Sequence, residues 1–113
     1  MIGMDYPTGS GARDRHLEYE GVVEPLLRYL GSLPRSKAIN VHGGIYTERG
    51  TPDVIGCVGG RMVAFECKRD RTERPTRIQL WRLSEWIRAG AVVGAIASVE
   101  DAELILRLMG VVE

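Results

Sequence analysis

The sequence of 113 residues predicts an α/β fold, a mixed β-sheet in which an antiparallel meander and one crossover strand are flanked by helices. Helix-like and strand-like segments follow one another in the order helix, three strands, helix, strand, helix. Two of the strands enclose Gly59-Gly60, a strong signal for a tight hairpin turn. A long amphipathic helix separates this hairpin from the last strand, as a crossover connection requires.

The first helix and the first strand contain interruptions. Apolar residues at helical spacing predict a helix over about residues 15–31. Pro25 lies either in the first turn of a shorter helix or at a kink in a longer one. Residues 37–50 are typical of a strand, broken or bulged at Gly43-Gly44, that leads into a loop.

The second half of the chain gives clearer signals. Residues 69–77 predict a polar, basic loop, and residues 75–90 predict the clearest helix of the sequence. Residues 91–98 are a continuous apolar run suited to a strand buried on both faces, and residues 98–110 predict a helix capped by Ser98. The apolar stripe of the clearest helix comprises Ile78, Leu80, Trp81, Leu83, Trp86 and Ile87.

The composition is that of a folded globular protein, with 44% hydrophobic and 27% charged residues. Residues 1–13, rich in Gly, Ser and Pro, predict a flexible tail, and residues 14–113 a single domain. No apolar run approaches the roughly 20 residues that span a bilayer, and the start lacks the features of a signal peptide. We therefore expect a cytoplasmic protein with no membrane partner. Cys57 and Cys67 fit small buried positions rather than a disulfide or zinc site.

Charge is unevenly distributed, although the formal net charge is zero. The segment from Arg61 to Arg88 holds 8 basic and 4 acidic residues, whereas the rest of the chain holds 7 basic and 11 acidic residues. Two interpretations remain open: a local phosphate-binding surface on a neutral protein, or a solvated helix and loop.

The predicted hairpin brings three ionisable residues together. With Gly59-Gly60 as a two-residue turn, Asp53 falls directly opposite Glu66, and Lys68 shares their face because side chains alternate along a strand. Opposed Cβ atoms lie about 4.5–5.5 Å apart, where two carboxylates repel each other. Either one acid is protonated or a cation lies between them. A hard divalent ion, Mg²⁺ or Mn²⁺, prefers such oxygen ligands.

A simpler interpretation needs no ligand. Asp53 then belongs to a Thr-Pro-Asp turn, and Glu66 and Lys68 lie at an exposed strand end. Against this, the residues around Glu66, "MVAFEC", are apolar on both faces, and a buried acid without a partner is costly. The residues alone leave both interpretations open.

The wider pattern resembles a known family. Pro52-Asp53, followed after twelve residues by Glu66-Cys67-Lys68, resembles the PD-(D/E)XK nuclease motif. The stretches "GTPDVIG", "AFECK", "RPTRIQ" and "AGA" in this order resemble the VRR-NUC domain, especially its stand-alone viral and bacterial form, over roughly residues 20–100. The resemblance implies a restriction-endonuclease-like fold. It also implies cleavage of phosphodiester bonds in DNA, often in branched substrates such as Holliday junctions or flaps.

The same resemblance implies a cofactor, partners and roles for individual residues. The enzyme would use Mg²⁺ or Mn²⁺ and no organic cofactor, and it would act as a homodimer in a bacterium or a phage-infected host. Asp53 and Glu66 would bind the metal, and the backbone carbonyl of Cys67 would be a further ligand. Lys68 would position the attacking water.

Two further site residues follow from the resemblance. Gln79 matches a glutamine that accompanies the motif, although its spacing from Thr76 also fits a helix capping box. The family also supplies an acid from the first helix, for which Glu20 fits best and Glu18 and Glu24 compete. A solvated surface glutamate remains the alternative for this position.

Four arginines that follow the motif are the best candidates for contacts to DNA phosphates: Arg69, Arg71, Arg74 and Arg77. Trp81 and Trp86 fit the apolar stripe and are interpreted as core or dimer contacts rather than base-stacking residues. Two other classes of function remain: a non-catalytic nucleic-acid-binding or assembly module with the same fold, and a metal-binding structural protein.

Overall fold

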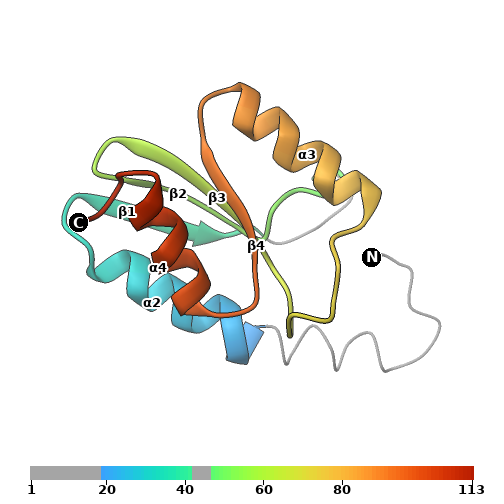
Figure 1. Cartoon of the computed structure of the whole chain (residues 1–113), viewed down its shortest axis with the longest axis horizontal. Helices are drawn as coiled ribbons and strands as arrows, with labels where there is room; N and C mark the ends of the chain where they lie inside the picture. Colours follow the sequence, from blue (N-terminus) through green and yellow to red (C-terminus); the bar gives the residue numbers. More distant parts are fainter. Residues whose placement is uncertain (1–18, 42–46) are drawn as a thin grey trace.

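The computed structural model describes residues 19–41 and 47–113, which contain a four-stranded sheet and the helices beside it (Figure 1). The order of helices and strands predicted from the sequence is confirmed, with a π-helical turn before the first α-helix. No helix in this part of the chain is long and apolar enough to cross a membrane. The elements are η1 (Tyr19–Val23), α2 (Glu24–Ser32), β1 (Ser36–Asn40), β2 (Val54–Val58), β3 (Arg61–Cys67), α3 (Arg77–Arg88), β4 (Val92–Ile96) and α4 (Val99–Leu108).

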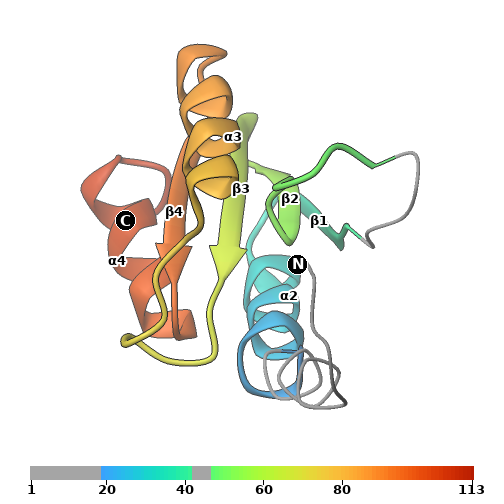
Figure 2. The same ribbon diagram turned by 90° about the vertical axis from the view of Figure 1, so that its right-hand side faces the viewer.

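The sheet is mixed and its strand order is β1-β2-β3-β4. The first three strands form an antiparallel meander, and β4 runs parallel to β3. A parallel neighbour needs a crossover connection, which α3 provides by passing over one face of the sheet. Figure 2 shows α3 in front of β3 and β4, with the 68–76 loop leading from the end of β3 to the start of the helix.

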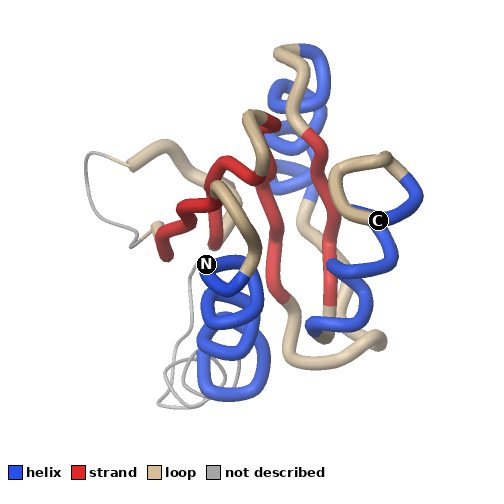
Figure 3. Tube along the Cα trace, turned by 90° about the vertical axis from the view of Figure 1, so that its left-hand side faces the viewer, coloured by secondary structure: helices blue, strands red, loops and turns tan. Residues whose placement is uncertain are grey.

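Helices cover the two faces of the sheet unequally. On one face α2 packs on β1, α4 packs on β4, and the two helices touch each other (Figure 3). The core lies on this face, where fully buried apolar side chains of the strands and of both helices meet. On the other face α3 packs substantially on two strands, β3 and β4. The main core residues are Val54, Val63, Phe65, Cys67, Val92, Ile96, Leu26, Leu30, Ala102 and Leu106.

The β2–β3 turn has the predicted geometry. Gly59 and Gly60 have φ angles of 57° and 87°, and positive values at both central positions define the primed turn that suits a twisted hairpin. The register follows from this turn, with Val58 paired to Arg61 and the last ladder pair formed by Val54 and Phe65. Asp53 and Glu66 are therefore the next two residues beyond this ladder.

The first helix resolves the two interpretations of Pro25 in favour of a first-turn position. Helix α2 starts at Glu24, so Pro25 lies in its first turn. The π-helical turn η1 precedes it directly. The predicted tail over residues 1–13 and the predicted break at Gly43-Gly44 lie outside the described residues.

Two expectations about burial were wrong, one for Cys57 and one for β4. Cys67 is buried as expected, but Cys57 is exposed, because it lies on β2, on which α3 does not pack substantially. Strand β4 is buried at Val92 and Ile96 but not on both faces, since Ala95 is exposed on the face that α3 covers only in part. In α3 only Leu83 is buried, whereas Leu80, Trp81 and Ile87 are 53%, 53% and 56% exposed. The physical reason is the small contact area: α3 covers two strands, and its apolar stripe is wider than that contact. Trp81 is consequently not a core residue, and its alternative interpretation as a dimer contact remains a prediction.

Candidate active site

Four polar residues from three places in the chain meet on the α3 face of the sheet. Asp53 directly precedes β2, Glu66 and Lys68 lie at the end of β3, and Gln79 belongs to the first turn of α3. Alternation along β3 places Glu66 on the face opposite to its core neighbours, Phe65 and Cys67.

The loop before Asp53 lies against α3 because of a glycine. Gly50 has a φ angle of 79°, and a Cβ atom there would lie 2.9 Å from the backbone of Ile78. Any other residue would be strained and would push the helix away. The close approach thus fixes the relative position of two of the four polar residues, Asp53 and Gln79.

Asp53 is held by backbone groups at the end of the hairpin. Its Oδ2 accepts a hydrogen bond of 2.8 Å from the backbone N–H of Cys67, and its carbonyl accepts one of 2.7 Å from Val41. The carboxylate therefore takes the place of a strand partner just past the last ladder pair, beside Glu66. A charge-assisted bond of this kind orients the carboxylate firmly.

Glu66 is the only buried charged residue in the described part of the chain, at 3% exposure. Its Oε2 accepts a hydrogen bond of 2.8 Å from Gln79 Nε2 and lies 3.5 Å from Lys68 Nζ. Its Oε1 is buried and has no hydrogen-bond partner among the described residues. Such an atom is costly in a folded protein and commonly marks a missing ion or water.

Burial and mutual repulsion dominate the electrostatics of the two acids. Burial, reinforced by the negative charge of Asp53, raises the pKa of Glu66 from about 4.5 to about 9, against the opposing effect of Lys68. Burial also raises the pKa of Asp53, although the Cys67 N–H favours its charged form. At neutral pH the pair therefore retains a proton unless a cation compensates the second charge.

Lys68 is fixed rather than mobile. Its ammonium group donates a hydrogen bond of 2.9 Å to Gln79 Oε1, and its side chain is 12% exposed. Its backbone N–H donates to Ile96 of β4 over 2.7 Å. The lysine thus presents a mostly covered, oriented positive charge directly beside the Glu66 carboxylate.

The capping box predicted for Gln79 is confirmed, and its role in the site remains a prediction. Thr76 and Gln79 form a complete capping box, with the hydroxyl of Thr76 accepting from the backbone of Gln79 and the side chain of Gln79 accepting from the backbone of Thr76. The same amide bridges Lys68 and Glu66. The spacing in the sequence favoured each role separately and gave no sign that one side chain performs both.

The residues present fit a hard divalent cation. The donors are carboxylate oxygens, and Glu66 Oε1 is an acceptor still without a partner among the described residues. Within residues 19–41 and 47–113, however, no group of three or more His, Cys, Asp or Glu residues gathers at one point. The described side chains that could hold such a cation are therefore the carboxylates of Asp53 and Glu66, and the ligand roles of both acids and of the Cys67 carbonyl remain predictions.

The acid expected from the first helix is not placed. The backbone of Glu20 belongs to η1, but its side chain and the whole of Glu18 lie outside the described residues. Glu24 is exposed and pairs with Arg28 over 3.1 Å on its own helix. Glu24 therefore has a surface partner of its own, and Glu20 remains the candidate.

The four candidate arginines differ in their partners. Arg69 pairs with Asp70 over 3.7 Å, and Arg71 pairs with Asp101 at the start of α4. Arg74 and Arg77 are exposed and have no ion pair or hydrogen bond to another described residue. An open groove of about 450 Å³ is lined by Lys68, the 70–75 part of the loop and the first turns of α4.

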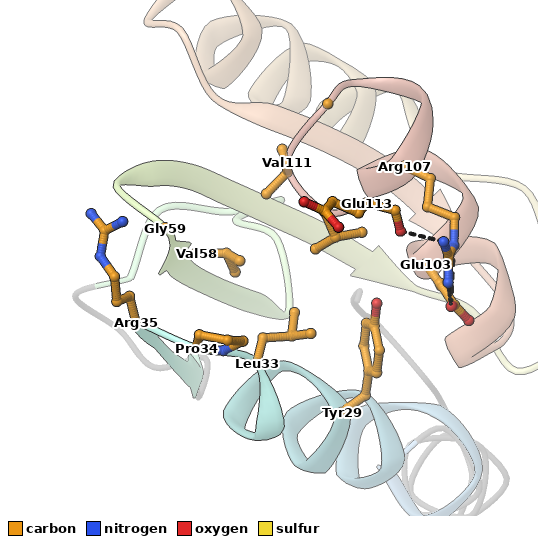
Figure 4. A pocket seen from close by; sticks show the side chains of 12 residues that line it. Tyr29, Leu33, Pro34, Arg35, Val58, Gly59, Glu103, Arg107, Val111 and Glu113 are labelled. Carbon is orange, nitrogen blue, oxygen red and sulfur yellow. Dashed lines mark hydrogen bonds and ion pairs between the residues drawn. The ribbon is translucent and has the colours of Figure 1, made fainter.

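A larger hollow of about 750 Å³ lies on the other side of the molecule, between α2, the β2–β3 turn and the end of the chain (Figure 4). Tyr29 points into it from α2, while Arg107 is tied to Glu103 and to the carbonyl of Glu113. The lining contains none of the four polar residues described above. The hollow is therefore separate from the polar residues on the α3 face.

Comparison with known proteins identifies the fold. No protein-family model matches the sequence, and no curated protein matches it. A solved structure described as "VRR_NUC domain" superposes with a TM-score of 0.56 and 18% sequence identity, over 85% of this chain and 92% of that chain. At this identity the likeness concerns the fold alone, and it agrees with the mixed sheet and the α3 crossover. The chain has the fold of a VRR_NUC domain.

Proposed function

We propose that the protein is a nuclease that hydrolyses phosphodiester bonds in DNA with the help of Mg²⁺ or Mn²⁺. The observation that carries this proposal is the contact of Asp53 with the buried Glu66, whose Oε1 has no partner among the described residues. An acid pair of this kind is stable in its charged form only with a cation. The fold shared with a VRR_NUC domain supports the same reaction class.

In this proposal Asp53 and Glu66 hold the cation, with the Cys67 carbonyl and Glu20 as further ligands. When bound, the cation would supply positive charge to the scissile phosphate and would lower the pKa of a water molecule. Asp53 enters this arrangement already oriented, because Cys67 donates to its Oδ2 over 2.8 Å. Glu66 likewise has one oxygen fixed by Gln79 and the other available.

Lys68 aligns the attacking water and stabilises the negative charge that develops on the phosphate. Its ammonium group is suited to this because Gln79 Oε1 and Glu66 Oε2 hold it in place. The site lies against the sheet, where a charge acts more strongly than in bulk water. Gln79 supports both partners and need not touch the substrate.

The substrate in this proposal is branched or otherwise structured DNA. Arg74 and Arg77 are available for phosphate contacts, and Arg69 and Arg71 would exchange their carboxylate partners for phosphates. A homodimer would supply two sites and a longer basic surface for a symmetric branch. Trp81 and Ile87 on α3 provide exposed apolar area for a second copy.

The test uses purified protein, Mg²⁺ or Mn²⁺, and three DNA substrates: a four-way junction, a flap and a linear duplex. We expect the wild type to cut, and Glu66→Gln and Lys68→Ala to lose cutting. Glu103→Gln, which changes a distant acid paired with Arg107, is the matched control and should cut normally. Binding without cutting would favour the non-catalytic module, and cutting by Glu66→Gln would overturn the assignment of the site.

A further inference from the structure

The amide of Gln79 is surrounded by three partners. Its Oε1 accepts two hydrogen bonds, one of 2.9 Å from Lys68 Nζ and one of 2.8 Å from the backbone N–H of Thr76. Its Nε2 donates one bond of 2.8 Å to Glu66 Oε2. Both lone pairs of the oxygen are therefore in use.

The backbone N–H of Thr76 decides which way this amide faces. An amide side chain can turn over and exchange its oxygen and nitrogen positions. Lys68 favours the same orientation, because its ammonium group can only donate and lies 2.9 Å from Oε1. The N–H of Thr76 is a rigid donor, so a reversed Gln79 amide would set N–H against N–H. In that orientation Glu66 would also face an oxygen and would no longer have its donor.

The hydroxyl of Thr76 holds this N–H in place. It accepts a hydrogen bond of 3.2 Å from the backbone of Gln79 and fixes the first turn of α3. Thr76 itself is extended, with φ −72° and ψ 166°, the conformation of a helix N-cap. Thr76 thus forms two hydrogen bonds with Gln79. Its hydroxyl accepts from the Gln79 backbone, and its backbone N–H donates to the Gln79 side chain.

We propose that Thr76 is a positioning residue of the active site: through its hydroxyl and its N–H it sets the Gln79 amide so that Oε1 faces Lys68 and Nε2 faces Glu66. Thr76 needs no contact with metal or substrate for this role. The proposal rests on the proposed function in one respect, because the consequence for metal binding requires Glu66 to be a ligand. The orientation of Gln79 itself does not depend on any activity.

Three substitutions separate the hydrogen bond of the Thr76 hydroxyl from that of the Thr76 N–H. Thr76→Ser keeps the hydroxyl and the N–H, Thr76→Ala loses the hydroxyl, and Thr76→Pro loses both. Proline is compatible with the observed φ of −72°. Ser98→Ala is the matched control: Ser98 caps α4 by accepting from Asp101 over 3.1 Å, so its loss removes a helix cap of the same kind elsewhere.

Two measurements report on the orientation of Gln79 and on metal binding. The first is the side-chain amide resonances of Gln79 in the metal-free protein, which report whether Nε2–H is bonded to Glu66. The second is the dissociation constant for Mn²⁺ by calorimetry. We expect Thr76→Ser to match the wild type and Thr76→Pro to bind Mn²⁺ about tenfold more weakly, since residues that orient ligands have effects of this size. Thr76→Ala should lie between them with altered Gln79 resonances.

The control should lose stability and keep both the Gln79 resonances and the Mn²⁺ affinity. The proposal is overturned if Thr76→Ala and Thr76→Pro keep the wild-type resonances and affinity, or if Ser98→Ala weakens Mn²⁺ binding as much as Thr76→Ala. If Thr76→Pro does not fold, the comparison of Thr76→Ala with Ser98→Ala decides. A wild type that never cuts DNA refutes the proposed function and leaves the resonance test valid.

Discussion

The two faces of the sheet use neighbouring residues of the same strand for opposite purposes. Along β3, Phe65 and Cys67 are fully buried among apolar side chains, whereas Glu66 between them is equally buried among Asp53, Lys68 and Gln79. The first face is closed by α2 and α4, and the second is only partly covered by α3. A core of interlocking side chains gives the strand a fixed position.

The comparison teaches how a small chain can hold a buried acid pair. Burial of apolar side chains on one face stabilises the end of β3. This compensates for the other face, where Asp53 and Glu66 repel each other when no cation is bound. The apolar face should therefore govern folding under all conditions. The α3 face should govern how stability depends on pH and on divalent metal.

The largest expected effect comes from weakening the apolar face. Phe65→Ala removes a fully buried ring and should reduce the free energy of unfolding by about 3–5 kcal/mol. Urea unfolding followed by circular dichroism measures this. The loss should be the same at pH 6 and pH 8, because Phe65 carries no charge. A loss below about 1 kcal/mol would mean that the core is not centred on this strand.

The second effect concerns the α3 face in the metal-free protein. Glu66 has a pKa near 4.5 when unfolded and about 9 when folded. Between these values the folded state binds the proton that the unfolded state releases, so stability is highest below pH 4.5 and falls as pH rises toward 9. One such proton corresponds to a fall of at most about 1.4 kcal/mol per pH unit.

Urea unfolding in the presence of a chelator at pH 5, 6, 7 and 8 measures this slope. The raised pKa of Asp53 acts in the same direction. In Glu66→Gln the slope should shrink strongly, because the titrating group is absent. A wild type whose stability is constant over this range would contradict the buried, proton-retaining pair.

A third effect concerns the close approach that sets α3 over the site. Gly50→Ala should lower the free energy of unfolding by about 1–3 kcal/mol, because the left-handed backbone and the 2.9 Å approach to Ile78 both disfavour a side chain. Gly31→Ala is the matched control, since it lies in α2 with nothing within 4 Å of the added carbon. It should be neutral or stabilising by up to about 1 kcal/mol. Equal effects of the two substitutions would argue against the close approach.

The smallest effect concerns the basic loop. Replacing Arg74 and Arg77 by Gln should weaken DNA binding and reduce the slope of log affinity against log salt by about 0.9 for each phosphate that the protein no longer neutralises. The same change at Arg28 and Arg107, which pair with acids on α2 and α4, is the control. An unchanged slope after the Arg74 and Arg77 substitutions would remove both residues from the proposed DNA surface.

The sequence predicted the features that depend on local rules. The glycine pair and the alternation of side chains were sufficient for the hairpin register, and that register accounts for the meeting of Asp53 and Glu66. The fold class followed from the order of the elements and is confirmed.

Features that depend on distant packing were not accessible. A stripe of apolar residues shows that α3 is amphipathic, but not that Trp81 and Ile87 remain half exposed. The ion pair of Arg71 with Asp101 joins residues 30 positions apart, and no local sequence pattern predicts it. The double role of Gln79 also required the three-dimensional arrangement of α3 over β3.

The most direct test of the central claim is thermal and urea unfolding of the wild type at pH 8, with and without Mn²⁺. If Asp53 and Glu66 hold the cation, Mn²⁺ should stabilise the wild type by about 2.7 kcal/mol at a concentration 100 times its dissociation constant. Asp53→Asn and Glu66→Gln should show no such gain, and Glu103→Gln should show all of it. A wild type that neither Mn²⁺ nor Mg²⁺ stabilises, or a Glu66→Gln variant stabilised equally, would contradict the claim.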